Sequence, residues 1–245
     1  KMIKNILGRL FTVWGGIVFI VSMLIFMPAV WISGMLDEPK RTSIFIRICR
    51  SWMAIFFTLT GVRLKIMGRD AFKKGENYIV VCNHNSLMDV PLTSPGIPGA
   101  NKTIAKIEMA KIPVFGIIYK RGSVLLDRKN DSSRRESYLA MKSVLEQGMH
   151  MCIYPEGTRN KTENPLKSFQ DGAFRLSFET GKKIIPCLIK GTREMLPHNK
   201  SFFFWPGKAS MQFLPAIDPK DFVSATEMKE HVFQLMWNGI VAMKN

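Results

Sequence analysis

The sequence has few cysteines, and their arrangement argues against a familiar kind of metal site. Four are present in 245 residues, and no two of them have the close spacing of metal ligands. Three lie in predicted strands, where a free cysteine is typical of a small buried side chain in a reducing compartment. We therefore expect no zinc site, no other bound metal and no cofactor. The four residues are Cys49, Cys82, Cys152 and Cys187.

Acidic residues are also scarce: 19 Asp and Glu stand against 35 Lys and Arg, which gives a formal net charge of +16. A surplus of this size predicts a polyanionic partner, namely nucleic acid, an anionic membrane surface or phosphorylated small molecules. No nucleic-acid-binding motif of recognisable spacing is present, and the aromatic residues gather in apolar runs instead of alternating with basic ones. We therefore expect no nucleic-acid partner and favour anionic membrane lipids and phosphorylated substrates.

Charge is absent altogether from residues 10–36, a run long enough to cross a hydrocarbon core as a helix. A second apolar segment, residues 44–62, contains Arg47 and Arg50 and is a poorer span. A cleaved signal peptide is the alternative for the first run, but the run is long for such a peptide and no small-residue cleavage pattern follows it. Basic residues flank both outer ends, which favours a membrane-anchoring helical hairpin of residues 1–62. Whether this hairpin spans the bilayer or enters one leaflet is left open.

Beyond residue 62, short apolar strands alternate with helices, which is the signature of an α/β domain. We expect residues 63–245 to form a mixed central sheet flanked by helices. The predicted strands are residues 62–67, 78–82, 103–105, 123–126, 149–154, 184–189 and 210–214, with a loop at 93–99 and a helix at 172–180. Capping boxes open two more helices, at Ser133 with Glu136 and at Ser224 with Glu227. The last helix carries an apolar stripe that we expect to face the core, formed by Met228, Val232, Leu235, Met236, Ile240 and Met243.

One stretch combines a strand with residues that carry chemistry. Residues 78–82 form a short apolar run, and small polar residues follow at once. His84 therefore lies just beyond the carboxyl end of a predicted strand, the edge at which open α/β sheets bind ligands. Asp89, five residues on, can turn back to hold one nitrogen of the imidazole and leave the other free as a base. A surface histidine that caps a helix is the alternative interpretation.

A second stretch repeats this design, because the apolar residues 149–154 are followed by a tight polar turn. Together the two stretches resemble the glycerolipid acyltransferases, and among these the 1-acyl-glycerol-3-phosphate acyltransferases. Four motifs match in order: Asn83, His84 and Asp89; Gly122 with the strand leading to Asp127 and Arg128; Tyr154, Pro155, Glu156, Gly157, Thr158 and Arg159; and Ile184, Ile185, Pro186, Cys187 and Leu188. Such an ordered set is far more specific than any member of it. Tyr154 and Cys187 depart from the family pattern, both at apolar positions.

The resemblance implies a role for each motif residue. His84 is the general base for a glycerol hydroxyl, and Asp89 fixes its tautomer and stabilises the imidazolium. Arg128 and Arg159 each follow a strand and hold the phosphate of the acceptor lipid. The other predicted members of the site are Glu156, which accepts a hydrogen bond from glycerol, Gly157, which permits close backbone approach, Thr158 in the same turn, and Lys106 as a further phosphate ligand.

Two side chains near His84 are alternative nucleophiles. Ser86 carries a hydroxyl, but a serine that caps a helix is the commoner case. Cys82 carries a thiol, but core packing is the commoner role of a free cysteine in a strand. A thioester donor is already activated, so direct attack by an alcohol requires no protein nucleophile.

The resemblance therefore implies an enzyme that moves a fatty acyl chain from acyl-CoA or acyl-ACP to lysophosphatidic acid, giving phosphatidic acid. We expect it at the cytoplasmic membrane with the catalytic domain facing the cytoplasm. The alternatives are an ester hydrolase or an acyltransferase for another lysolipid, and a non-catalytic lipid-binding membrane protein. A hydrolase has no use for two arginines that grip phosphate or for a site protected from water. The aromatic residues 201–207 either rest on the bilayer interface or pack inside the protein.

Overall fold

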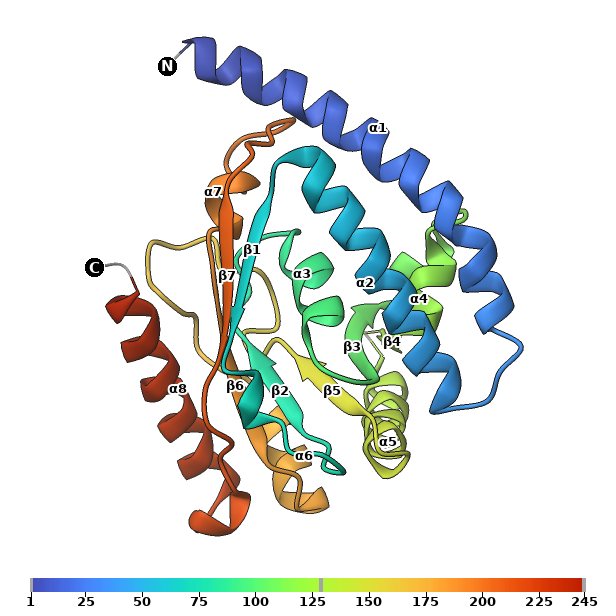
Figure 1. The fold of residues 1–245 in the computed structure, drawn as a ribbon. Coiled ribbons are helices and arrows are strands. Elements are labelled where there is room, and N and C mark those ends of the chain that lie inside the picture. Colours follow the sequence, from blue (N-terminus) through green and yellow to red (C-terminus); the bar gives the residue numbers. More distant parts are fainter. Residues whose placement is uncertain (1, 128–129, 244–245) are drawn as a thin grey trace.

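The computed structural model describes residues 2–127 and 130–243 (Figure 1). The strands are β1 (Arg63–Met67), β2 (Ile79–Cys82), β3 (Asn101–Lys106), β4 (Ser123–Leu126), β5 (His150–Ile153), β6 (Ile184–Lys190) and β7 (Lys208–Phe213). The helices are α1 (Met2–Ser33), α2 (Lys40–Thr60), α3 (Asp89–Gly96), α4 (Gly116–Gly122), α5 (Asp131–Glu146), α6 (Gly172–Thr180), α7 (Thr192–Met195) and α8 (Ala225–Ala242). Short 3-10 turns occur at Arg69–Ala71, Ile107–Lys111 and Pro219–Asp221.

The strands form one mixed sheet in the order β1-β7-β6-β2-β5-β3-β4. The run from β6 to β4 is parallel throughout, whereas β7 is antiparallel to β6 and parallel to β1. Parallel neighbours need crossover connections, and the helices between them supply these and cover both faces. The predicted fold class, a mixed α/β sheet flanked by helices, is confirmed.

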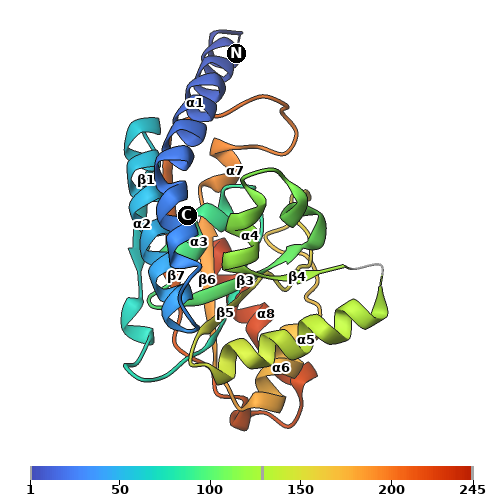
Figure 2. The same cartoon turned by 90° about the vertical axis from the view of Figure 1, so that its right-hand side faces the viewer.

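Alternate residues along each strand enter different cores, as the period of a strand requires. Val80 of β2 packs toward Trp52 and Phe56 of α2 on one face. Val81, the next residue, packs on the opposite face in the core that also contains α6 and α8 residues such as Met236. Figure 2 shows the two layers, with α1 and α2 on one side of the sheet and α5, α6 and α8 toward the other.

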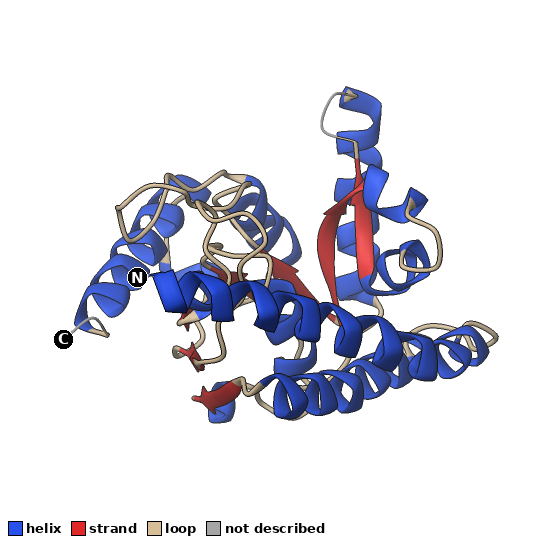
Figure 3. Cartoon of the chain, turned by 90° about the horizontal axis from the view of Figure 1, so that it is seen from above, coloured by secondary structure: helices blue, strands red, loops and turns tan. Residues whose placement is uncertain are grey.

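The two apolar N-terminal helices differ in what they touch. Both are long and apolar enough to cross a membrane by length and composition, but 44% of the most apolar window of α2 is buried against 22% for α1. Trp52, Phe56 and Phe57 of α2 belong to the core that it shares with the sheet. In α1, large apolar side chains such as Ile25 and Trp31 are exposed. Figure 3 shows α1 running along the outside of the molecule beside α2.

The turn between these helices is fixed to the sheet. The Glu38 carboxylate lies 2.8 Å from the Lys102 ammonium of β3 and accepts a hydrogen bond from the backbone N–H of Thr42. Burial alone would raise the pKa of the Glu38 carboxyl, but these partners outweigh it and lower the pKa to about 2. Arg50 of α2 donates hydrogen bonds to the carbonyl oxygens of Pro95 and Ile97 at the end of α3. Both the turn and α2 are therefore held by the sheet layer.

The aromatic residues 201–207 pack largely against α1. Phe203 and Phe204 are buried, and their rings lie against Gly8 and Gly15, where α1 has no side chain in the way. A Cβ at Gly8 would lie inside the ring of Phe203, so this contact depends on glycine. Phe202 is 61% exposed. The interior interpretation is thus correct for two of these aromatic residues, while Phe202 projects outward.

Two predictions of local structure were wrong. The loop expected at residues 93–99 from its Pro and Gly content is helical up to Gly96: Pro95 removes one N–H donor, but the N–H of Ile97 still closes the last turn of α3 on the carbonyl oxygen of Thr93. Helix α5 begins before the expected capping box: the side chain of Asn130 accepts from the N–H of Ser132 and of Ser133. The Ser133 hydroxyl instead accepts from the N–H of Asp127.

The prediction for α8 was correct at its start and partly wrong along its stripe. Ser224 accepts from the N–H of Glu227, and the Glu227 carboxylate accepts from the N–H of Val223, one residue earlier than in a standard capping box. Met228 and Met236 are fully buried, as expected. Leu235 was predicted to face the core but is 37% exposed.

Candidate active site

The parallel strands bring the predicted site residues to one edge of the sheet. Strands β2, β5, β3 and β4 are neighbours in that order and run in the same direction. Their carboxyl ends therefore lie side by side, and the residues that follow them share an edge. His84 follows β2, the turn with Glu156 and Arg159 follows β5, Lys106 ends β3, and Asp127 follows β4.

His84 and Asp89 make the predicted contact. Nδ1 of His84 lies 2.8 Å from Oδ2 of Asp89, whose side chain is fully buried at the first residue of α3. The same oxygen accepts hydrogen bonds from the backbone N–H groups of Asn85 and Ser86, at 2.6 and 2.8 Å. An oxygen of an ionised carboxylate can only accept hydrogen bonds, so the imidazole must be the donor in this contact. In the neutral ring, Nδ1 therefore carries the proton and Nε2 is bare.

The histidine is accessible on its other side. Its side chain is 17% exposed, and Nε2 makes no hydrogen bond with any residue that the structure describes. A neutral imidazole held in this way presents a lone pair at the sheet edge. The histidine and the carboxylate are arranged as in the Ser-His-Asp triads, although no serine of the described residues completes the set here.

The two motif turns are locked to each other through Glu156. This residue is 3% exposed, and its Oε1 accepts from the N–H of His84 while Oε2 accepts from the N–H of Lys167, each at 2.8 Å. The N–H of Asn160 donates to the carbonyl oxygen of His84 at 2.6 Å. Burial raises the pKa of the Glu156 carboxyl, although the two N–H donors oppose the rise. The Glu156 carboxylate therefore joins the backbone of the two turns. The expected role was a side chain free to meet glycerol.

Asn83 fixes the other side of the histidine. Its side-chain amide donates to the carbonyl oxygen of Ile189 at 2.9 Å and accepts from the N–H of the same residue at 2.7 Å. This pair of bonds joins the end of β2 to the neighbouring strand β6, as a backbone ladder would. The position of His84 is thus set from β6 by Asn83 and from the β5 turn by Glu156.

Tyr154 forms one wall beside the histidine. Its ring centroid lies 4.3 Å from that of His84, and its hydroxyl pairs with the Thr93 hydroxyl at 2.6 Å. Burial raises the pKa of this phenol well above its usual value. The phenol of Tyr154, which stands at an apolar position, is thus satisfied by a single hydroxyl on α3.

The rest of the β5 turn is shaped by Gly157 and Lys167. Gly157 has a φ of +71°, a conformation in which a side chain would be strained. Thr158 is exposed, and its hydroxyl accepts a hydrogen bond from the ammonium of Lys167 at 2.7 Å. Gly157 and Thr158 thus lie in the turn that follows β5, at the edge that carries His84.

The three predicted phosphate ligands are Arg159, Lys106 and Arg128. Arg159 is partly exposed, and its guanidinium makes no hydrogen bond or ion pair with the described residues. Lys106 is exposed at the end of β3 and is likewise without a partner in that part of the chain. Arg128 lies outside the described residues. Arg159 and Lys106 are therefore cations at the edge that holds His84, one in the turn after β5 and one at the end of the neighbouring strand β3.

Neither alternative nucleophile is placed to react. The Ser86 hydroxyl donates to the carbonyl oxygen of Leu196 at 3.1 Å and accepts from the N–H of Met88. Cys82 is fully buried, and desolvation raises the pKa of its thiol well above the usual value. All four cysteines are buried and free. Among the described residues, no group of three or more His, Cys, Asp or Glu is placed to hold a metal ion.

Sequence reasoning missed the residues that support the site. Asn160 and Lys167 act through backbone N–H groups, which carry no signal in the sequence. Thr93 lay in the segment predicted as a loop. Arg193 of α7 also supports the β5 turn by donating to the carbonyl oxygens of Asn160 and Thr162, at 2.6 and 2.9 Å. Only the tight polar composition of the turn pointed to this region.

Fold and site together define an α/β protein of acyl-transfer type, with a histidine–carboxylate pair at the carboxyl edge of its parallel strands. The acyltransferase family model matches residues 63–190. A 1-acyl-sn-glycerol-3-phosphate acyltransferase from Helicobacter pylori is 30% identical over 185 residues, which are 75% of this chain and 76% of that protein. The chain belongs to the acyltransferase family.

Other relatives carry the same name. The enzyme from Cocos nucifera is 36% identical over 116 residues, which are 46% of this chain and 37% of that protein. The alpha enzyme from Mus musculus is 29% identical over 162 residues, or 65% of this chain and 56% of that one. This chain thus spans about a third to three quarters of the length of these relatives.

The likeness extends to the whole fold. The crystal structure of the 1-acyl-sn-glycerophosphate acyltransferase PlsC from Thermotoga maritima superimposes with a TM-score of 0.83 at 27% sequence identity. The superposition covers 98% of this chain and 97% of that one, so it includes both N-terminal helices.

Proposed function

We propose that this protein transfers a fatty acyl chain from a thioester donor, acyl-CoA or acyl-ACP, to the free hydroxyl of 1-acyl-glycerol-3-phosphate. The product is phosphatidic acid. The observation that carries this proposal is the 2.8 Å contact of His84 with buried Asp89 at the sheet edge shared with Arg159 and Lys106. The names of the similar proteins support the choice of lysophosphatidic acid as acceptor.

In the proposed mechanism, Nε2 of His84 takes the proton of the glycerol hydroxyl as its oxygen attacks the thioester carbonyl. A new C–O bond forms, and the carbonyl π electrons move onto oxygen. When the tetrahedral intermediate collapses, the C–S bond breaks and the thiolate leaves, taking the proton from the imidazolium. Asp89 stabilises the imidazolium between these steps and holds the tautomer that exposes Nε2.

Binding of the acceptor is assigned to the cations of the same edge. Arg159 offers a planar fork that matches two phosphate oxygens, and Lys106 adds a point charge from the neighbouring turn. Arg128 keeps its expected role as a further phosphate ligand. Gly157 and Thr158 line the approach of the glycerol. Glu156 is proposed to act by holding the backbone of His84, because both of its oxygens accept backbone N–H groups.

We further propose that residues 1–62 bind the membrane through α1 and that residues 63–245 carry the chemistry. The outward apolar side chains of α1 suit one leaflet, while Trp52, Phe56 and the Glu38–Lys102 ion pair keep α2 and the connecting turn on the sheet. This favours insertion into one leaflet over a hairpin that crosses the bilayer. The catalytic edge then faces lipid from the cytoplasmic side of the cell membrane, where a soluble donor is available.

The activity is tested by mass spectrometry of the products formed by purified protein. The protein receives acyl-CoA or acyl-ACP and lysophosphatidate in mixed micelles, with water as the competing acceptor. Whichever of the two donors the protein uses, the expected product is phosphatidic acid. Release of free fatty acid without phosphatidic acid would identify a hydrolase instead, and the absence of both products would favour a lipid-binding role.

The membrane arrangement is tested by labelling single cysteines in intact cells with an impermeant thiol reagent, in a background that lacks Cys49. The positions are Asp37→Cys in the turn, which leaves the Glu38–Lys102 pair intact, and Lys4→Cys near the amino terminus. Neither is expected to react from outside. Labelling of position 37 would contradict one-leaflet insertion, and labelling of position 4 would contradict the hairpin altogether.

A further inference from the structure

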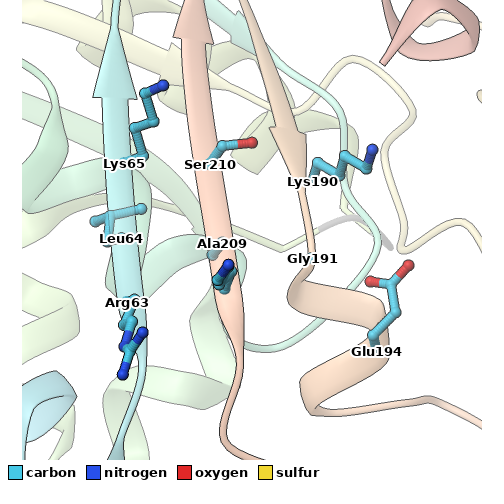
Figure 4. A pocket seen from close by; sticks show the side chains of 9 residues that line it. Arg63, Leu64, Lys65, Lys190, Gly191, Glu194, Ala209 and Ser210 are labelled. Carbon is cyan, nitrogen blue, oxygen red and sulfur yellow. The ribbon is translucent and has the colours of Figure 1, made fainter. Parts of the chain in front are cut away.

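A hollow opens at the sheet edge that carries His84, on the opposite side of β2 from the β5 turn. It has a volume of about 550 Å³ and lies where β6 ends and where β7 and β1 begin. Ser210, Gly191 and Glu194 of α7 contribute to its wall (Figure 4). A hollow of this size falls in the range of small-molecule sites.

The charge of this hollow is strongly unbalanced. Four of its lining residues are basic, namely Arg63, Lys65, Lys190 and Lys208, and one is acidic, Glu194. Arg63, Lys65 and Lys208 are exposed and form no ion pair within the part of the chain that the structure describes. Lys190 donates one hydrogen bond to the carbonyl oxygen of Met243. Several unpaired cations around a concave surface favour a compact polyanion.

The direction of these side chains separates the hollow from the membrane helices. Leu64 and Ile66 of β1 pack into the core beneath α2, on the face of the sheet that α1 and α2 cover. Arg63 and Lys65 alternate with them along the strand and therefore project from the other face. The hollow thus opens on the face of the sheet opposite to the one that α2 covers.

We propose that this hollow binds the phosphorylated nucleotide end of a coenzyme A thioester, which carries a diphosphate bridge and a ribose phosphate. The inference rests on the proposed acyl transfer and assigns the non-reacting end of its donor. Strands β1 and β2 are separated by β7 and β6, about 14 Å at the usual spacing of strands. An extended pantetheine arm covers that distance along the sheet edge. The thioester then reaches His84 while the nucleotide stays on the basic face.

The inference is tested by calorimetric binding of coenzyme A and dephospho-coenzyme A, which lacks the ribose phosphate, to the full chain in detergent micelles. The test variant is Lys65→Gln with Lys208→Gln, which removes two exposed charges and keeps both side-chain lengths similar. The matched control is Lys74→Gln, another exposed lysine, at the opposite edge of the sheet. Binding is measured without turnover, so failure of the proposed function appears separately in the product assay.

We expect the double variant to weaken coenzyme A binding about tenfold, since each 1.4 kcal/mol of lost contact energy is a factor of ten. Dephospho-coenzyme A should bind wild type more weakly and lose less on substitution, and Lys74→Gln should bind like wild type. Unchanged coenzyme A affinity in the double variant would overturn the assignment. Two other results for the double variant would overturn it as well. One is weaker binding to phosphatidylglycerol vesicles alone, and the other is a higher KM for acyl-ACP alone.

Discussion

Two histidines stand at opposite edges of the same sheet, and their surroundings differ in every respect that governs proton chemistry. His84 follows the carboxyl end of β2, is partly exposed and contacts the buried Asp89 carboxylate through Nδ1. His150 begins β5 at the other edge, and its Nδ1 accepts a hydrogen bond from the N–H of Tyr78 at 3.0 Å. Its ring is nearly covered, stacked on Tyr78 and met edge-on by Phe72.

The contrast shows that the environment decides what a histidine does. Burial lowers the pKa of His150 to about 4, although the Pro98 carbonyl opposes the shift, so its ring stays neutral at physiological pH. His84 has a carboxylate that stabilises the charged imidazolium and an open nitrogen that can take a proton. The two rings should also be opposite tautomers: Nδ1 of His84 is a donor, whereas Nδ1 of His150 is an acceptor.

The largest effect is expected from removing the open histidine. His84→Ala should lower the rate of phosphatidic acid formation by about 10⁴-fold, because the general base is lost. The midpoint of thermal unfolding should change little, since the imidazole is partly exposed. The assay is product formation by mass spectrometry, with His150→Asn as the matched control. Near-normal turnover by His84→Ala would remove the whole mechanism.

A smaller loss is expected when the histidine is kept but its partner is neutralised. Asp89→Asn should lower kcat by about 10²- to 10³-fold, because the tautomer and the stabilisation of the imidazolium are lost while the base remains. The KM of the acceptor should stay close to that of wild type. Circular dichroism checks that α3 still forms. A loss equal to that of His84→Ala would mean that the carboxylate does more than orient the ring.

A modest effect is expected at the phosphate site beside His84. Arg159→Lys should raise the KM of lysophosphatidate about tenfold, because the bidentate fork is lost while the charge remains. The kinetics of the donor should be nearly unchanged. The control acceptor is a monoacylglycerol, which has no phosphate. If the substitution affects both acceptors equally, Arg159 is structural.

The smallest effect on transfer, none at all, is expected at the opposite edge, where His150 affects stability instead. The pKa of His150 is about 4 when folded, below the usual 6.5, so the unfolded chain binds more protons between these two pH values. The contribution of His150 is therefore fully present above pH 6.5 and is lost as the pH falls toward 4, by about 3 kcal/mol. His150→Asn should flatten this part of the pH dependence without affecting transfer. The free energy of unfolding of wild type and of His150→Asn is measured with denaturant at pH 7 and pH 4.5. An equal change with pH in the two proteins would contradict the assignment.

The sequence allowed the sheet and the histidine motif to be predicted because both depend on local pattern. The strand at residues 123–126 and the helix at residues 172–180 were located to the residue, since apolar runs there end at sharp polar or glycine boundaries. The contact of His84 with Asp89 followed from its position at a strand end. The second half of helix α3 was missed because the Pro and Gly residues of 93–99 suggested a loop.

The supporting contacts could not be predicted, because they join segments that are distant in the chain. The partners of Glu156 are the backbone N–H groups of His84 and Lys167, 72 and 11 residues away. The pairing of Asn83 with Ile189 spans 106 residues. The packing of α2 against the sheet was not predicted either, although α2 is less apolar than α1. These features depend on strand order, which no local pattern specifies.

The most direct test of the central claim is the tautomer of His84, measured by nitrogen-15 NMR of protein labelled at histidine. His84 and His150 are assigned by the loss of their signals in the His84→Ala and His150→Asn variants. At neutral pH we expect His84 to carry its proton on Nδ1 with Nε2 bare, and His150 to carry its proton on Nε2. A proton on Nε2 of His84 with Nδ1 bare would contradict the account, because the nitrogen that faces the substrate could then accept no proton.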